Sequence, residues 1–221
     1  MSNNQSYIAL LLDAPLQAWG ISSRFERRGT ALHPSKSAVI GMIAAAMGID
    51  KYDPTEPAQI VELAELNIMM ITLPKKNPMR RIEDFHTTEG TLRADGSHNK
   101  NCVVSRREYL VDARFGVLIK GENELLHRIA SALQNPIWGI WLGRKSCIPA
   151  LPVFVGHEGD EAIIWRKLLS YAKIAEDSSL DEFNRIEEVK EFSEGNDSVR
   201  DTPITFSRPA AYRPRRIRSI I

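Results

Sequence analysis

Cysteine and long apolar runs are scarce in this sequence of 221 residues, and their scarcity removes several classes of protein. Its two cysteines, Cys102 and Cys147, are too few for a disulfide framework or for a zinc site of their own. No apolar run is long enough to span a bilayer, and the polar start MSNNQS is unlike a signal peptide. We therefore expect a protein of the reducing cytoplasm that makes no membrane contact.

Patterns that bind metal are also missing. His33, His127 and His157 have no partner at metal-ligand spacing. No group of acidic residues resembles a two-metal catalytic site. We therefore expect no metal and no other cofactor.

The net charge is only +1, which by itself does not point to nucleic acid. The charges are unevenly placed, however. Residues 1–155 hold 18 Lys and Arg against 15 Asp and Glu, residues 156–200 hold 6 against 12, and residues 201–221 hold 5 against 1. The acidic residues between 176 and 197 predict a solvated loop or a weakly held helix that screens the basic tail. Prolines among the arginines of the tail, 207–221, predict an extended strand.

Hydrophobic periodicity predicts the order strand, helix, strand, strand, helix, strand before residue 156. The strands are expected at 7–12, 67–73, 115–120 and 151–155, and the helices at 37–47 and 122–134. This order is that of the ferredoxin-like unit, an antiparallel sheet backed by two helices, so we predict an α+β fold. Residues 1–156 would form this palm, and 157–221 a C-terminal extension with one helix from Glu161 to Ile174. Residues 74 to about 112, poor in apolar periodicity, predict a long hairpin arm between the second and third strands.

A basic loop joins the first strand to the first helix. It runs from Gln17 and Trp19 through a cluster of arginines to Lys36, with Ser35 or Ser37 as the helix N-cap. A cationic, glycine-bearing loop at a helix N-terminus suits a polyanion. The arginines and aromatic rings of the loop would bind phosphates and stack on bases of an RNA strand. The alternative is that Trp19 belongs to the core and the arginines form a solvated face.

A second candidate is the turn Leu142-Gly143-Arg144-Lys145-Ser146-Cys147. A glycine beside two cations and a serine lets the backbone approach a phosphate closely. Cys147 is interpreted as a small packing residue rather than a reactive thiol.

Several motifs together resemble one known family. LLLDAPLQAWG, followed by SKSAVIGMIAAAMGI, is similar to the N-terminus of CasD-type subunits of type I-E CRISPR Cascade complexes. The stretches FHT at 85–87, SRREYLVDA at 105–113 and LGRKSC at 142–147 match the same family in the same order. The resemblance covers most of the first 155 residues and fades after Gly156.

The resemblance implies a RAMP-superfamily subunit of a ribonucleoprotein complex for antiviral defence, with a modified RNA-recognition-motif palm and a thumb-like arm. It implies a non-catalytic protein that holds the 5′ handle of CRISPR RNA and caps the helical-backbone subunits. The large subunit would dock nearby, and target DNA would be reached only through the complex. The expected RNA-binding residues are Gln17, Trp19, Arg24, Arg27, Arg28, Lys36, Ser37, Arg106, Arg107, Tyr109, Gly143, Arg144, Lys145 and Ser146.

Two alternatives stay open at this point. Relatives of the family cleave precursor CRISPR RNA without metal, and His86, His98, Lys100 and Tyr109 are candidates for such a group. The second alternative is a protein-only adaptor whose basic tail binds an acidic partner.

Overall fold

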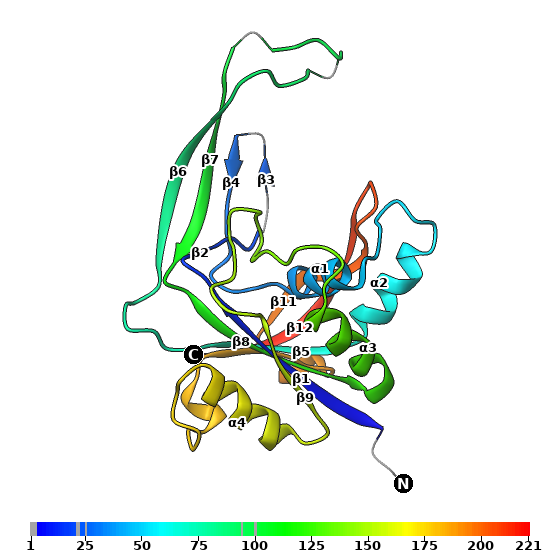
Figure 1. Cartoon of the computed structure of the whole chain (residues 1–221), viewed down its shortest axis with the longest axis vertical. Coiled ribbons are helices and arrows are strands. Elements are labelled where there is room, and N and C mark those ends of the chain that lie inside the picture. The colour runs from blue at the N-terminus through cyan, green and yellow to red at the C-terminus, as the bar shows by residue number, and fades with distance from the viewer. Residues whose placement is uncertain (1–3, 21–22, 25, 94, 100) are drawn as a thin grey trace.

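The computed structural model describes residues 4–20, 23–24, 26–93, 95–99 and 101–221, and for Ser23 and Arg24 it describes the backbone alone (Figure 1). Within these residues seven strands form one sheet in the order β11-β12-β10-β5-β8-β1-β9. They are β1 (Gln5–Asp13), β5 (Asn67–Thr72), β8 (Arg114–Glu122), β9 (Phe154–Glu158), β10 (Arg185–Glu188), β11 (Asp197–Thr205) and β12 (Ala211–Ile220). The helices are α1 (Lys36–Met47), α2 (Glu56–Ala64), α3 (Asn123–Gln134) and α4 (Glu161–Tyr171).

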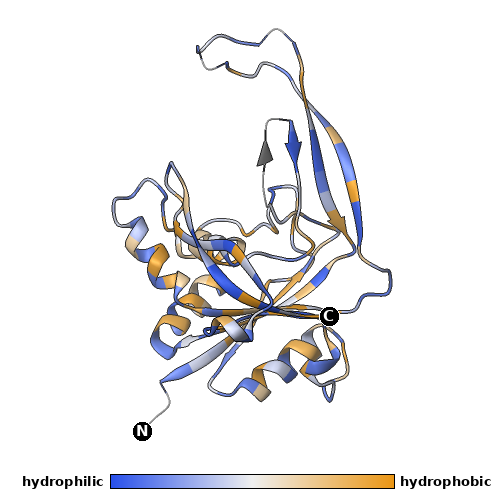
Figure 2. Ribbon diagram, turned by 180° about the vertical axis from the view of Figure 1, so that it is seen from behind, coloured by the Kyte–Doolittle hydropathy of each residue, from blue (hydrophilic) through white to orange (hydrophobic). Residues whose placement is uncertain are grey.

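A second, smaller sheet forms beside the first. Its strands are β2 (Leu16–Gln17), β3 (Ser23–Arg24), β4 (Arg27–Arg28), β6 (Arg80–Thr88) and β7 (Val103–Val111). β6 and β7 form a hairpin that projects away from the large sheet, as the sequence predicts, and β4 lies beside its base (Figure 1). Figure 2 shows that β4 is hydrophilic, whereas the middle of the large sheet is apolar.

The centre of the large sheet around β1 is covered on both faces, and β1 is accordingly apolar at successive positions. Ile8, Leu10 and Leu12 pack in one cluster with residues of α1 and α3. Ala9 points to the opposite face, where it packs with Leu168 of α4. The predicted combination of helices with antiparallel sheets is confirmed, and the described part of β1 is buried on both faces as its aliphatic run predicts.

The predicted fourth strand is displaced along the chain. It was expected at 151–155, but β9 begins only at Phe154. Pro152 has no backbone N–H with which to extend a ladder. The residues just before β9 therefore join β1 through two separate hydrogen bonds, from the amide of Leu11 to the carbonyl of Val153 and from the amide of Ala150 to the carbonyl of Asp13 (both 2.8 Å). α4 ends at Tyr171, three residues before the predicted end.

The acidic segment is not simply a solvated loop or a weak helix. Residues 185–188 form β10, which pairs with β5 on one side and with β12 on the other. The carboxylate of Glu187 lies between the guanidinium groups of Arg185 and Arg218 (each 2.5 Å), so opposite charges from the two strands neutralise each other. The basic tail is the extended strand that its prolines predict, and it is an inner strand of the sheet.

Candidate nucleic-acid interface

Four segments singled out by the sequence meet at the base of the hairpin. β2, which contains Gln17, pairs with the end of β7, and β4 runs parallel to β7 so that Arg28 lies opposite Arg107. The turn at 142–147 joins them, because the amide of Ala18 donates a hydrogen bond to the carbonyl of Leu142 (3.0 Å). Segments separated by more than a hundred residues therefore form one surface.

Arg144 links the turn to the strands. Its guanidinium donates hydrogen bonds to the carbonyls of Glu108 and Arg28, both at 2.8 Å. The same group lies over the ring of Tyr109, 4.5 Å from its centroid. The planar fork of an arginine suits this combination of two carbonyls and a ring face, which an ammonium group would not satisfy. Arg144 was predicted to contact RNA, and in this structure two of its donors position β4 and β7.

Gly143 serves a different purpose from the one predicted. Its φ is +98°, and a Cβ at this position would lie 1.7 Å from the carbonyl oxygen of Ala18. The glycine therefore allows close approach of the protein's own backbone rather than that of a phosphate. Lys145 and Ser146 are exposed in the same turn. Cys147 is fully buried, and this burial raises the pKa of its thiol, which agrees with a packing role.

Burial removes Gln17 and Trp19 from the predicted set of RNA-contacting residues. The side-chain amide of Gln17 donates to the carbonyls of Leu12 (3.0 Å) and Ala113 (2.8 Å), so it holds β2 against β1 and the turn between β7 and β8. The indole of Trp19 is 1% exposed and belongs to the main core cluster. The alternative reading of Trp19 as a core residue is the one that the structure supports.

The N-terminus of α1 does not offer a free anion site. Lys36 is 1% exposed, and its Nζ is 2.7 Å from the carboxylate of Glu188. Its backbone amide donates to the carboxylate of Asp201 (2.8 Å), and Ser35, hydrogen-bonded to Ser37, caps the helix. Burial lowers the pKa of Lys36, and Glu188 partly offsets that shift. Lys36 is thus corrected from an RNA contact to a core ion pair, because a carboxylate of the chain itself occupies the helix end.

The exposed arginines divide between two faces of the small sheet. In β7 and its neighbours, residues that pair directly point to the same face. On one face Arg27 and Arg106 share the carboxylate of Glu83, at 3.7 and 3.8 Å, and Arg106 lies over the ring of Phe85. Their charge is therefore partly compensated inside the protein.

The other face carries Arg28 and Arg107, with Asp84 directly opposite Arg107 in the β6–β7 ladder. Arg28 pairs in register with Arg107, whose Nε donates to the hydroxyl of Ser105 (3.2 Å). Within the described part of the chain, no carboxylate lies within 4 Å of the charged groups of Arg28, Arg107 or Lys145. Tyr109 points to this face but is only 6% exposed, beneath Arg144. Arg28 and Arg107 on this face, with Lys145 exposed in the neighbouring turn, can bind an anionic strand by its phosphates.

Part of the predicted set lies outside the described residues. The Arg24 side chain lies outside the described part of the chain. The backbone of Arg24 pairs with Arg27 in the short β3–β4 ladder. Lys100, from the nuclease alternative, also lies outside.

Almost the whole chain matches one protein family. The sequence model described as CRISPR-associated protein (Cas_Cas5) matches residues 7–218. The chain belongs to this family. A relative from Escherichia coli (strain K12), the CRISPR system Cascade subunit CasD, is 29% identical over 160 residues, which cover 69% of this chain and 71% of that protein. The resemblance to CasD-type proteins read from the sequence motifs is thereby confirmed.

Solved structures of the family share the fold. A chain of a CRISPR RNA-guided surveillance complex superposes with a TM-score of 0.74 at 27% identity, covering 97% of this chain and 89% of that one. A structure described as a Cas protein superposes with a TM-score of 0.63 at 25% identity, covering 96% and 93%. The match thus extends through the C-terminal region, where sequence motifs gave no family signal.

Sequence reasoning missed Thr30 and Glu108, whose hydrogen bonds connect the loop after β2 to β7. The amide of Trp19 donates to the hydroxyl of Thr30 (2.8 Å), and the amide of Thr30 donates to the carboxylate of Glu108 (3.3 Å). Thr30 stands in no motif, and Glu108 lies in the motif at 105–113 without a predicted role, so only the parallel pairing of β4 with β7 could reveal their contact. Over the described ranges, no three His, Cys, Asp or Glu side chains gather as a metal site, and no helix has the length and apolarity to cross a membrane.

Proposed function

We propose that this chain is a non-catalytic RNA-binding subunit of a Cascade surveillance complex, in which it holds the 5′ handle of CRISPR RNA at the base of its hairpin arm. The observation that carries the proposal is the convergence of the loop at 17–28, β7 and the turn at 142–147. Arg28 and Arg107 lie side by side there, and Lys145 is exposed in the turn. Among the described residues, no carboxylate lies within 4 Å of their charged groups. Single-stranded RNA is held by such cationic surfaces through its phosphates.

The proposal includes a ferredoxin-like palm with a thumb. The strand order β9-β1-β8-β5 with antiparallel neighbours supports this palm, because it is the order that a βαββαβ unit adopts. α1 and α3 pack on the same face of that sheet. Residues 1–156 would be the palm with its arm at 74–112, and 157–221 the extension that adds strands to the edge of β5.

The arm would meet the neighbouring helical-backbone subunit and so cap that backbone. Its strands leave Phe85 62% exposed and Ile82 43% exposed, and Leu92 beyond β6 is 68% exposed. Apolar side chains on a projecting hairpin are suited to burial against a partner. The large subunit would dock nearby, and target DNA would be contacted only through the assembled complex in the cytoplasm.

The endonuclease alternative finds little support in the described geometry. His86 pairs with Ser105, which is four residues from Tyr109 along β7, a distance of about 13 Å at ~3.4 Å per residue. The ring of Tyr109 is covered by Arg144, and His98 lies near the tip of the arm, where its Nδ1 is 3.3 Å from the carbonyl of Gly90. These side chains do not converge on one scissile bond.

The adaptor alternative needs a free basic tail. Arg213, Arg215 and Arg218 of the tail each pair with a carboxylate of the same chain. The tail is therefore a poor candidate for binding an acidic partner.

The proposal is tested with purified protein, a repeat RNA and a mature guide RNA, in the presence of a chelator. We expect intact repeat RNA, and binding that favours the 5′ handle and weakens with salt. Arg28→Gln and Arg107→Gln should each lower the salt slope by about 0.7, the value for one lost phosphate contact on a single strand. Arg166→Gln is the matched control, because Arg166 is exposed on α4 and its Nε bonds only to its own helix.

Three results would overturn the proposal. The first is cleavage of the repeat that disappears on substitution of His86, and the second is equal loss of binding in the Arg166 control. The third is RNA affinity that does not depend on salt.

A further inference from the structure

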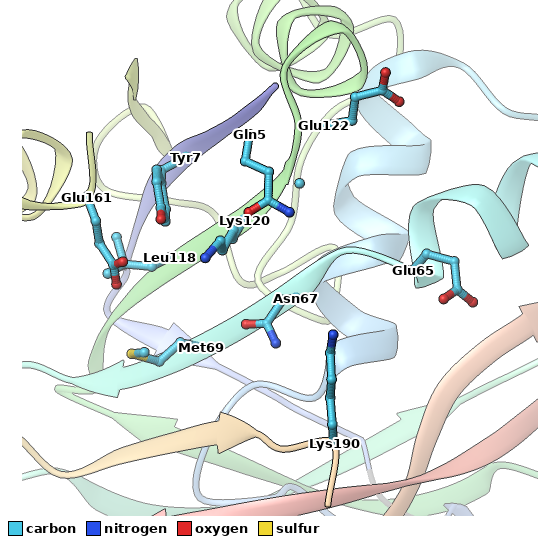
Figure 3. A pocket seen from close by; sticks show the side chains of 11 residues that line it. Gln5, Tyr7, Glu65, Asn67, Met69, Leu118, Lys120, Glu122, Glu161 and Lys190 are labelled. Atoms are coloured by element: carbon cyan, nitrogen blue, oxygen red, sulfur yellow. The ribbon is translucent and has the colours of Figure 1, made fainter. Parts of the chain in front are cut away.

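A groove of about 560 Å³ opens on the other face of the large sheet, the face that also carries α4 (Figure 3). Its floor is a row of three directly paired residues, Tyr7 on β1, Lys120 on β8 and Asn67 on β5. Leu118 and Met69 form the next row, which is apolar. The row containing Tyr7 belongs to the face of Ala9 and Leu168, whereas the candidate interface lies at the base of the arm. The groove is therefore separate from that interface.

Two lysines, Lys120 and Lys190, line the groove. The Nζ of Lys120 lies over the ring of Tyr7, 5.4 Å from its centroid, and Lys190 approaches from the opposite wall, on the other side of Asn67 in this view (Figure 3). Across the residues that the structure describes, neither ammonium group has a carboxylate within 4 Å. Of the acidic residues at the rim, Glu65 pairs with Arg213.

The other two acidic residues stand at the ends of the groove. Glu122 accepts a hydrogen bond from the side-chain amide of Asn4 (3.1 Å). Glu161, in the first turn of α4, points toward the floor beside Leu118 (Figure 3). Counting Arg213, three cations and three carboxylates surround the groove, so its formal charge is zero. The three carboxylates would repel a run of phosphates as strongly as the three cations attract it. A ligand with one anionic group could place that group at the cations and its hydroxyls at the carboxylates.

We propose that this groove binds one ribonucleotide unit with a terminal phosphate. Lys120 and Lys190 would hold the phosphate, since both ammonium groups lack an internal partner. The amide of Asn67 offers a donor and an acceptor for the edge of the base, and the ring of Tyr7 lies beneath the ammonium group of Lys120. A rim carboxylate accepts hydrogen bonds from ribose hydroxyls, as acidic residues do in dinucleotide sites. The volume lies in the range of about 300–1,000 Å³ typical of small-ligand sites.

The test is titration calorimetry of the full chain with AMP, with adenosine and with inorganic phosphate. We expect saturable binding of AMP, and weaker binding of adenosine by about tenfold or more, because two charge-assisted contacts are absent. Lys120→Gln and Lys190→Gln should each weaken AMP binding by a similar factor, and Tyr7→Leu should weaken it because the ring no longer holds the ammonium group of Lys120 in place. Lys51→Gln is the matched control, since Lys51 lies over the ring of Tyr52 at 4.9 Å in an exposed pair outside the groove.

Three outcomes would overturn the proposal: no saturable heat with AMP, equal affinity for AMP and adenosine, or AMP affinity unchanged in both lysine variants. A competing oligoadenylate with a 5′ phosphate identifies the source of the ligand. Competition shows that the groove accepts the end of an RNA strand, and absence of competition shows that it takes the free nucleotide. Arg28→Gln should leave AMP binding unchanged, so that failure here is distinct from failure of handle binding at the interface.

Discussion

Substituting Gly143 by alanine adds one carbon atom, the Cβ, and should destabilise the protein and displace the turn at the candidate interface. The added Cβ would lie 1.7 Å from the carbonyl oxygen of Ala18, whereas real Cβ contacts are essentially never under 3.0 Å. The turn or the loop must therefore move by at least 1.3 Å, the difference between the two distances. Since the atom that is met belongs to the backbone, no side chain can rotate away to relieve the contact.

The magnitude follows from two costs. A non-glycine residue held at positive φ is strained by about 1–3 kcal/mol. The displacement also breaks the hydrogen bond from the amide of Ala18 to the carbonyl of Leu142, which contributes about 1 kcal/mol. The free energy of unfolding should fall by about 2–4 kcal/mol, which lowers the melting temperature of a chain of this size by roughly 4–16 °C.

Gly20→Ala is the control for this experiment. Gly20 lies in the adjoining loop and does not have a positive φ, and none of the described residues has an atom within 4 Å of the position of its Cβ. Urea unfolding should show a change below about 1 kcal/mol for this variant. The reasoning would be refuted if Gly143→Ala unfolded within 0.5 kcal/mol of wild type (roughly the spread of neutral surface changes), or if the two variants lost the same stability.

Three further predictions concern the ion pairs around the interface and α1. Burial raises the pKa of Asp201, but hydrogen bonds and the charge of Arg215 outweigh burial and hold the pKa below 3.8. The stability that this carboxylate contributes is therefore present above pH 3.8 and is lost as the pH falls further. Asp201→Asn should lower stability at pH 7 and flatten the acid loss, measured by urea unfolding from pH 5 to pH 2. Arg144→Lys keeps the charge but loses the double contact with two carbonyls, so it should cost about 1–2 kcal/mol and weaken handle binding nearly as much as Arg144→Ala, measured by unfolding and filter binding. Glu83→Gln releases the two arginines that share this carboxylate, so RNA binding should tighten by up to about fivefold and its salt slope should increase.

Each of these has an outcome that contradicts it. An unchanged acid loss in Asp201→Asn would show that other carboxylates govern it. Full RNA affinity in Arg144→Lys would show that only the charge matters at that position. Weaker RNA binding in Glu83→Gln would mean that this carboxylate orders the arginines for the ligand.

Local signals predicted much of the fold. The aliphatic run of β1 and the amphipathic α3 appear where periodicity places them, because these elements bury faces that their own sequences define. The arm, predicted from its lack of apolar periodicity, is a hairpin whose strand β6 is exposed along its whole length. The prediction failed where distant charges meet. Nine acidic residues between 176 and 197 indicate a solvated segment, and seven of them are exposed. Glu187 and Glu188 instead form ion pairs with arginines of β12, about thirty residues later. No local pattern contains that pairing.

The same limit explains the candidate site. Motifs correctly marked the segments that meet at the arm, but they did not separate ligand-facing residues from supporting ones. Lys36 looks like a free cation in the sequence, yet Glu188 and Asp201 surround it in the structure. Gly143 looks like a phosphate turn, yet it accommodates Ala18. A charged or glycine residue in a motif defines a chemical capacity, and only the tertiary neighbours decide whether that capacity is already used.

The position of β10 has a consequence for how the protein is made. β5 is an inner strand of the finished sheet, but its neighbour β10 follows it by more than a hundred residues of chain. During synthesis, the side of β5 that pairs with β10 stays unpaired while the arm, α3, β9 and α4 emerge from the ribosome. An unpaired edge is where strands of different molecules join. Chains interrupted before residue 185 should therefore associate through β5 and aggregate, whereas chains that extend through β12 close their own sheet.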